Sequence, residues 1–345
     1  MAALAIACLS STAFAAAPRH LPLHTLRAIV IDVEGGAATL IATPGGQSIL
    51  LTRGWRQPAA GAVRVLAALQ QLDLRRLDVL IADYSPDLAA AVAALAQRVP
   101  IGEFWDAGLP APAVPRSARN PLATYWRLSQ GRRLRLHAGQ SVALRSAPSR
   151  PPLSLTILAA AAEAEHRATA LINPLCQSAP PPRAGKAAPA RTSLVVLFQF
   201  GEFRYLIGGD PDGSAELSLI CPRDAIGPVS VYQVSEFDPQ SAPNPVVIRT
   251  LRPTVTLVAN IGMDGGAAAT LQALRAELPQ RDLYQLHRVD PPAATSGQAP
   301  ANVANPSGLD FGQGLRLEVA TDGRSFRVIN ERTGQARAYS SLVAR

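Results

Sequence analysis

The chain has 345 residues, of which 48% are hydrophobic and 17% charged, and its formal net charge is +8. This apolar content is enough for a large core, and the low share of charged residues excludes a disordered polyelectrolyte. The 30 prolines and 25 glycines predict many turns and argue against a helical bundle. No apolar run beyond the N-terminus reaches the roughly 20 residues that cross a bilayer, which excludes an integral membrane protein.

The first 17 residues, MAALAIACLSSTAFAAA, form a short apolar stretch that ends in small residues. Such a stretch is typical of a cleaved secretory signal peptide, so we expect export to the periplasm or the cell exterior. Cleavage removes Cys8 and leaves Cys176 and Cys221. In an oxidising compartment these two cysteines are expected to form a disulfide, and the alternative is a pair of buried thiols.

Short apolar and β-branched runs predict many strands, and a few longer stretches with helical periodicity separate them. Ala60–Leu72 is expected to be helical, with Val63, Leu66, Leu69 and Leu72 on one face. Further helices are expected up to Arg98 and over Ser214–Ile220 and Gly265–Leu278, and a helical or irregular connection over Ala159–Ala170. The predicted strands are Leu26–Asp32, Ala38–Ala42, Ser48–Thr52, Leu77–Ala82, Ile101–Trp105, Arg133–Leu144, Leu153–Ala159, Leu194–Phe200, Phe203–Ile207, Val229–Val234, Thr254–Ala259, Asp282–His287, Leu315–Val319 and Ser325–Ile329.

These elements fall into two halves in which strands and helices mix. The order predicts an α/β fold of two mixed sheets stacked face to face with helices outside, a four-layer αββα sandwich. We expect one domain over 18–345, with a flexible Pro/Ala-rich insertion at 178–191, a loop at 291–308 and a C-terminal hairpin at 315–340.

Several segments resemble one known family. IDVEGGAATLIATPGGQSILLTRGW (Ile31–Trp55) is similar to the opening hairpins of metallo-β-lactamase-fold hydrolases. The resemblance is nearest to secreted bacterial proteins similar to the hydrolase domain of the competence protein ComEC. Phe203–Asp210, Val231–Pro239 and Leu283–His287 follow in matching order, so that the resemblance spans Arg27 to Tyr339. It implies a metallo-β-lactamase-like sandwich whose ligands hold one or two metals, usually zinc, that activate water for hydrolysis.

The positions that the resemblance assigns to the metal ligands are mostly altered. In the His-x-His-x-Asp-His segment, the first two histidines are replaced by Asp83 and Ser85, Asp87 is kept, and the last histidine is Leu88. A later histidine position holds Glu236.

Two more positions complete this ligand set. The strand-end aspartate is replaced by Thr52, and the bridging aspartate is kept as Asp210. Because these positions hold no imidazole, the sequence predicts that dinuclear zinc chemistry has been lost and that no cofactor binds.

The remaining donors are all oxygens, namely Asp83, Ser85, Asp87, Asp210 and Glu236. If they converge, they suit Mn²⁺, Mg²⁺ or Ca²⁺ rather than zinc. Several carboxylates in one cleft require a compensating charge, and Arg53 is expected to supply it.

Each of these residues also has a simpler interpretation. A helix start with Ser85 as N-cap explains Ser85, Pro86 and Asp87 without any metal. Asp210 is also typical of a turn, and Glu236 of a solvated loop.

Three functions remain open. The favoured hypothesis is a secreted, non-catalytic binding or scaffolding protein of unknown partner, and the alternative is an active metal-dependent hydrolase of phosphodiesters or related esters with a rebuilt carboxylate site. A nucleic-acid binder is supported only by the net charge and the competence-protein resemblance.

Overall fold

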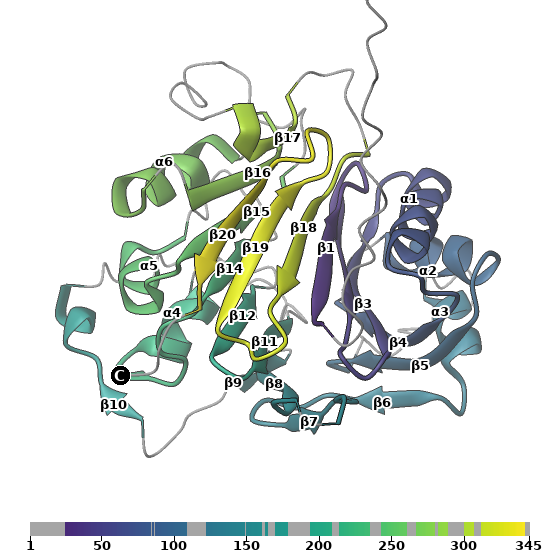
Figure 1. The fold of residues 1–345 in the computed structure, drawn as a ribbon. Coiled ribbons are helices and arrows are strands. Elements are labelled where there is room, and N and C mark those ends of the chain that lie inside the picture. Colours follow the sequence, from purple (N-terminus) through teal and green to yellow (C-terminus); the bar gives the residue numbers. More distant parts are fainter. Residues whose placement is uncertain are drawn as a thin grey trace, which may run out of the picture.

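A computed structural model of the chain shows two large mixed sheets packed face to face, with helices on both outer faces (Figure 1). The structure describes residues 25–83, 85, 87–108, 122–148, 150–160, 163–164, 170–178, 194–208, 214–234, 243–260, 267–279, 282–288, 300–306 and 312–341. The predicted αββα sandwich is therefore confirmed. The N-terminal signal and most of the 178–191 insertion and the 291–308 loop lie outside the described residues.

The two sheets have continuous strand orders. Sheet A follows the order β20 (Ala336–Ser340), β19 (Ser325–Asn330), β18 (Leu315–Val319), β1 (Arg27–Ile31), β2 (Gly36–Ala42), β3 (Ser48–Trp55), β4 (Leu77–Ala82), β5 (Ile101–Asp106), β6 (Arg133–Arg135). Sheet B follows the order β17 (Val303–Asn305), β16 (Leu283–His287), β15 (Val255–Val258), β14 (Val231–Val234), β12 (Phe203–Ile207), β11 (Leu194–Phe200), β8 (Leu153–Ala160), β7 (Ser141–Ala143). The short β9 (Glu163–Ala164) pairs with β8, and β10 (Leu171–Ile172) pairs with β13 (Arg223–Asp224).

Helices cover each sheet on its outer side. On sheet A lie α1 (Pro58–Gln71), α2 (Leu88–Ala96) and α3 (Ala123–Ser129), and on sheet B lie α4 (Ser214–Ile220), α5 (Pro245–Leu251) and α6 (Ala267–Glu277). Short 3₁₀ turns occur at Pro174–Ser178 and Pro300–Asn302. Among the described residues, no helix combines the length and apolarity needed to cross a membrane.

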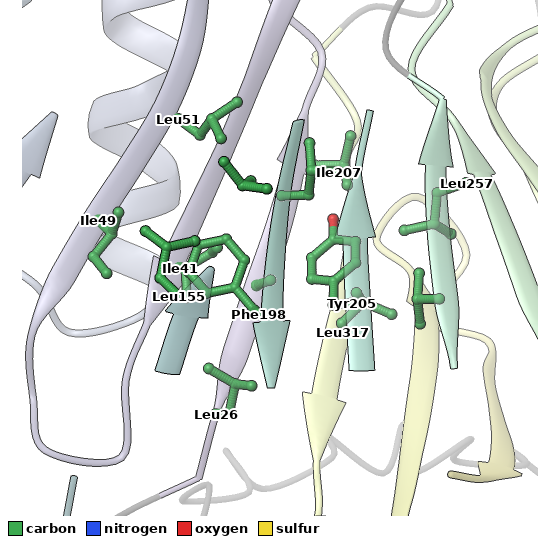
Figure 2. Close-up of a cluster of buried hydrophobic side chains, with 14 of the residues drawn as sticks. Leu26, Ile41, Ile49, Leu51, Leu155, Phe198, Tyr205, Ile207, Leu257 and Leu317 are labelled. Carbon is green, nitrogen blue, oxygen red and sulfur yellow. The ribbon is translucent and has the colours of Figure 1, made fainter. Parts of the chain in front are cut away.

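Strand periodicity sorts the apolar side chains into three layers. In β1, Ala28 and Val30 point into the layer between the sheets, whereas Ile29 and Ile31 point toward the helices over sheet A. Successive side chains of a strand face opposite sides, so one run of apolar residues serves two layers. Figure 2 shows the inter-sheet layer, where Phe198 and Tyr205 of sheet B lie among aliphatic side chains such as Leu317 of sheet A.

The first helix packs closely on sheet A because it carries small residues there. A Cβ on Gly61 would come within 2.6 Å of the Trp55 ring. Ala62, Val65 and Leu69 of α1 are buried beside it. Val63 was predicted to lie on the buried face but is 55% exposed, because small residues rather than large ones line the closest contact.

Three predicted elements differ from the structure. The single strand expected over Arg133–Leu144 is split into β6 and β7, which belong to different sheets, because the chain turns at Gly139 with a φ of 82°. The connection expected to be helical or irregular at Ala159–Ala170 begins with the end of β8 and the short β9. The C-terminal segment forms three antiparallel strands rather than two, because Ala336–Ser340 pairs with β19.

The predicted disulfide between Cys176 and Cys221 is present, with the two Cα atoms 5.7 Å apart. Next to it, the buried Asn173 donates hydrogen bonds from its side-chain amide to the Ile220 carbonyl and the Thr250 hydroxyl. Covalent and polar links therefore fasten the segment that follows β10 to α4 and α5.

Replacing both cysteines, as Cys176→Ser/Cys221→Ser, is expected to lower the free energy of unfolding by about 4 kcal/mol. The disulfide closes a loop over a sequence separation of 45, and a loop of this length restricts the unfolded chain by about that amount in the chain-entropy model. Chemical denaturation of the parent and the double variant measures the difference. An unchanged denaturation midpoint, or two free thiols in the unreduced, denatured parent, would contradict the prediction.

Candidate functional site

Polar residues follow the carboxyl ends of strands in both sheets, and these ends meet at one edge of the sandwich. Asp32 follows β1 in sheet A, and His287 closes β16 in sheet B. Their side chains lie 3.0 Å apart, from Nε2 to Oδ1. The carboxyl ends of β4, β12 and β14 point to this same edge, because β4 runs in the direction of β1, and β12 and β14 run parallel to β16.

Asp83 follows β4 and is buried, at 1% exposure. The Arg53 Nε lies 3.4 Å from its Oδ2 atom, and only 12% of the Arg53 side chain is exposed. The charge compensation expected from Arg53 is thus confirmed for this carboxylate. A guanidinium cannot lose its charge in a protein, so Asp83 faces a permanent cation that the chain itself provides.

The side chains of Thr52 and Leu88, two other expected ligand positions, are already engaged in hydrogen bonding and in core packing. The Thr52 hydroxyl donates to the Ala37 carbonyl and accepts from the Trp55 indole N–H (2.9 Å) and the Gly54 N–H (3.3 Å). One donor and two acceptor sites are all that a hydroxyl has. Leu88 is fully buried among the apolar residues between sheet A and its helices. Neither side chain can serve as a metal ligand in this arrangement.

Ser85 and Asp87 are placed differently from the predicted helix start. The Ser85 hydroxyl donates to the Arg53 carbonyl rather than capping a helix. Helix α2 begins at Leu88, with Asp87 at its N-cap in αR conformation and without a side-chain capping bond. Asp87 is exposed, whereas Asp83 is buried. The two carboxylates therefore have different environments.

This segment approaches the end of β3 very closely. Gly54 has a φ of 106°, and a Cβ there would lie 2.6 Å from the Leu88 nitrogen and 2.7 Å from the Ser85 Oγ. A side chain at this position would meet both strain and a steric clash. The close approach holds Ser85 on the backbone of Arg53.

The other two expected ligands, Asp210 and Glu236, lie outside the described residues. In the sequence, Asp210 is three positions after β12 and Glu236 is two positions after β14. Within the part of the chain that the structure describes, no group of three His, Cys, Asp or Glu side chains is arranged to hold a metal ion. Of the described positions that the sequence resemblance assigned to metal ligands, Thr52 holds a saturated hydroxyl, Asp83 an ion-paired carboxylate and Leu88 a core side chain, and these three groups do not fit a dinuclear zinc site.

The contact between Asp32 and His287 was missed by the sequence analysis. Asp32 holds the turn that follows β1, since its Oδ1 accepts the Glu34 N–H at 3.0 Å. Its Oδ2 accepts the Gly312 N–H at 2.7 Å and lies 3.3 Å from Arg64 Nη1. Only the position of both residues at strand ends indicated that they could meet.

These contacts determine the ionisation of Asp32. Burial raises the pKa of its carboxyl group, but the hydrogen bond and charge of His287 and the N–H groups of Gly312 and Glu34 outweigh burial, so the pKa is lowered. Asp106, at the end of β5, is similar: burial raises its pKa, but the hydrogen bonds from Arg133 and Tyr125 outweigh burial, so the pKa is lowered. Arg133 holds Asp106 with two 2.6 Å contacts.

A further buried carboxylate lies on the other side of sheet B. Glu216, in the first turn of α4, is buried, and both of its oxygens accept the Tyr232 hydroxyl, at 2.9 and 2.8 Å. Burial raises the pKa of Glu216 to about 7, against a lowering effect of the Tyr232 hydrogen bond. Its Oε1 would lie 2.7 Å from a Cβ on Gly208, so Glu216 packs directly behind the end of β12.

The chain is similar to the metallo-β-lactamase fold protein YhfI from Bacillus subtilis, with a TM-score of 0.43 and 13% identity, over 75% of this chain and 95% of YhfI. It is similar to CmlA, a diiron β-hydroxylase from Streptomyces venezuelae (0.41, 12%, 77% of this chain and 53% of CmlA). It is also similar to a long form RNase Z from yeast, with a TM-score of 0.40 and 10% identity, over 93% of this chain and 50% of RNase Z.

The chain thus spans about half the length of CmlA and RNase Z. No protein-family model and no curated protein sequence matches it. At these TM-scores, the assignment of the αββα architecture depends on the strand order of this chain itself.

Arg53→Met is expected to lower the free energy of unfolding by about 3 kcal/mol, because it removes the cation beside a buried carboxylate. Arg98→Met, at an exposed position that follows α2, is the control and should change it by less than about 0.5 kcal/mol. In a double-mutant cycle with Asp83→Asn, the coupling energy should be at least about 1 kcal/mol. Additive effects of the two substitutions would show that the ion pair contributes nothing.

Glu216→Gln is expected to change how stability depends on pH. The pKa of Glu216 is raised from 4.5 to about 7 in the folded chain, so the folded state holds this proton more tightly than the unfolded state. The stabilisation that this bound proton gives to the folded state is complete below pH 4.5. It is lost as the pH rises to about 7, at about 1.4 kcal/mol per pH unit. Between about pH 5 and pH 8 the parent should therefore lose roughly 3 kcal/mol more than the variant.

Urea denaturation of both proteins at the two pH values measures this difference. Glu103→Gln, an exposed carboxylate on β5, is the matched control and should follow the parent. The same pH dependence in the parent and in Glu216→Gln would contradict the assignment.

Proposed function

We propose that this chain is a secreted sandwich protein of the metallo-β-lactamase type that has lost zinc chemistry and works as a non-catalytic binding or scaffolding protein. The observation that carries the proposal is the ion pair of Arg53 with the buried Asp83, 3.4 Å apart. In the family resemblance described from the sequence, Asp83 occupies the position of a zinc-binding histidine. A guanidinium there supplies the positive charge that a carboxylate otherwise obtains from a metal.

The neighbouring strand ends support the same proposal. Asp32, Asp83 and Asp106 end or follow three strands of sheet A, and each faces an arginine: Arg64 at 3.3 Å, Arg53 at 3.4 Å and Arg133 at 2.6 Å. Carboxylates that are already neutralised attract a cation less strongly, because metal binding would have to break or oppose the existing ion pair.

Export is the second part of the proposal. It is supported by the apolar N-terminal stretch and by the disulfide between Cys176 and Cys221, because disulfides persist mainly in oxidising compartments. Detection of the chain after fractionation of its host cells, together with the N-terminal residue of the mature form, tests this part. A mature chain that starts at Met1 in the cytosol would contradict it.

Metal content decides between this proposal and its alternative, an active hydrolase with a rebuilt oxygen-ligand site. The mature protein, purified without a histidine tag, is incubated with zinc, manganese or calcium, and its metal is measured by mass spectrometry after gel filtration. The proposal predicts far less than one ion per chain in every condition. One or two tightly held ions that are lost in Asp210→Ala but kept in the control Asp322→Ala would support the rebuilt hydrolase instead.

A further inference from the structure

Strand β6 leaves main-chain groups unpaired at one edge of sheet A. It is the last strand of that sheet, and among the described residues it pairs only with β5 (Figure 1). Just before β6, the Arg132 carbonyl accepts the Phe104 N–H at 2.8 Å and so faces β5. Because successive residues of a strand direct their main-chain groups to opposite sides, the N–H and C=O groups of Arg133 and Arg135 point away from the sheet.

The two faces of β6 differ in chemistry. In the register of β5 and β6, Arg135 lies opposite Asp106 and Leu134 lies opposite Trp105. Trp105 belongs to the layer between the sheets, so Leu134 faces that layer and Arg133 and Arg135 face the helices. All three residues of β6 are exposed, Leu134 at 37%. The edge therefore presents cations on one face, an apolar side chain on the other and unpaired main-chain groups between them.

The part of the sequence around β6 is basic. Residues 107–162 contain eight arginines and no aspartate, glutamate or lysine, and the rest of the chain holds 25 basic and 25 acidic residues. The formal net charge of +8 comes entirely from this stretch. Arg133 is ion-paired with Asp106, whereas Arg135 forms no ion pair among the described residues. The charge at this edge therefore favours an acidic partner.

The alternation of the two faces indicates what kind of acidic partner fits. Charged residues on an edge strand commonly prevent pairing with another sheet, but arginines repel only cationic strands and attract an acidic one. A lipid surface or a nucleic acid has no chemistry that alternates with the two-residue period of a strand. An extended peptide has that period, and it can also bond to the outward N–H and C=O groups.

We propose that β6 is a docking edge for an extended protein segment in which acidic and apolar residues alternate. The segment adds to sheet A as a further strand and forms main-chain hydrogen bonds with Arg133 and Arg135. Its acidic side chains lie beside these two arginines, and an apolar side chain lies beside Leu134. This pairing involves no expected metal ligand, so it is independent of whether the strand-end site binds a metal.

The test is fluorescence anisotropy of a short labelled peptide of alternating glutamate and valine, titrated with the full mature chain. The parent should bind the peptide, and binding should weaken when salt is raised from about 0.1 M to about 1 M, which shortens the screening length from about 10 Å to about 3 Å. Three matched peptides should bind at least about 10-fold more weakly. They are alternating lysine and valine, the same glutamates and valines in two blocks, and the original sequence with methylated main-chain nitrogens.

Two substitutions of Arg135 separate its charge from its main-chain bond. Arg135→Gln removes the charge and should weaken binding about fivefold, the upper range for one cross-strand charge pair. Arg135→Pro also removes the outward N–H and should weaken binding about 10-fold further. Proline is tolerated at an edge position whose N–H points away from the sheet, and melting temperatures of all variants confirm that they are folded.

The matched control is Ala338→Pro, at an exposed position of β20, the strand at the other edge of sheet A. The Ala338 N–H also points outward, because pairing alternates and the Ser341 N–H bonds to the Arg324 carbonyl. This variant should bind the glutamate–valine peptide within about twofold of the parent, since β20 lacks the exposed leucine between two arginines.

Three results would overturn the proposal. The first is that the parent does not bind the alternating glutamate peptide. The second is that the methylated peptide binds as tightly as the unmethylated one, or that Arg135→Pro weakens binding no more than Arg135→Gln, because either result would mean attraction by charge without strand pairing. The third is that duplex DNA or phosphatidylglycerol vesicles bind the parent more tightly than the peptide does, which would assign this edge to a phosphate-bearing partner.

Discussion

The apolar layer between the two sheets determines where every polar residue of the candidate site lies. Phe198, Phe203 and Tyr205 of sheet B pack against sheet A within this layer. Because side chains of a strand alternate, this packing fixes the register of both sheets. The carboxyl ends of β1 and β16 then meet at one edge, as the 3.0 Å contact between Asp32 and His287 shows.

At that edge the chain neutralises its own carboxylates. Arg53, Arg64 and Arg133 come from β3, α1 and β6 and reach Asp83, Asp32 and Asp106. Buried carboxylates without a counter-charge would raise their pKa or bind a cation. Arginine provides this counter-charge permanently, so the fold can keep these carboxylates buried and charged without a bound cation.

Much of the fold followed from the sequence, because apolar runs such as those of β1 and β4 are short, β-branched and bounded by turns. The disulfide also followed, since only two cysteines remain after the expected cleavage. The split of Arg133–Leu144 into strands of two sheets did not, because one alternating pattern fits either sheet and Gly139 alone marks the turn. Val63 was misplaced because helix packing at Trp55 is governed by the small Gly61 and Ala62.

The candidate site was predictable only in part. The role of Arg53 followed from its position beside Thr52 and from the surplus of carboxylates. Ser85 matched a helix cap by type, but the close approach at Gly54 directs its hydroxyl to the backbone of Arg53. The contacts of Asp32 with His287 and of Glu216 with Tyr232 join residues that are far apart in the sequence or on different elements, and no local pattern encodes them.

A crystal structure of the mature chain grown with excess manganese tests the central claim most directly, because anomalous scattering locates the ion independently of the protein atoms. The account predicts that the Arg53 guanidinium lies beside the Asp83 carboxylate and that no anomalous peak appears at the strand-end edge. A strong peak coordinated by Asp83 together with Asp210 or Glu236, with Arg53 displaced from Asp83, would contradict it.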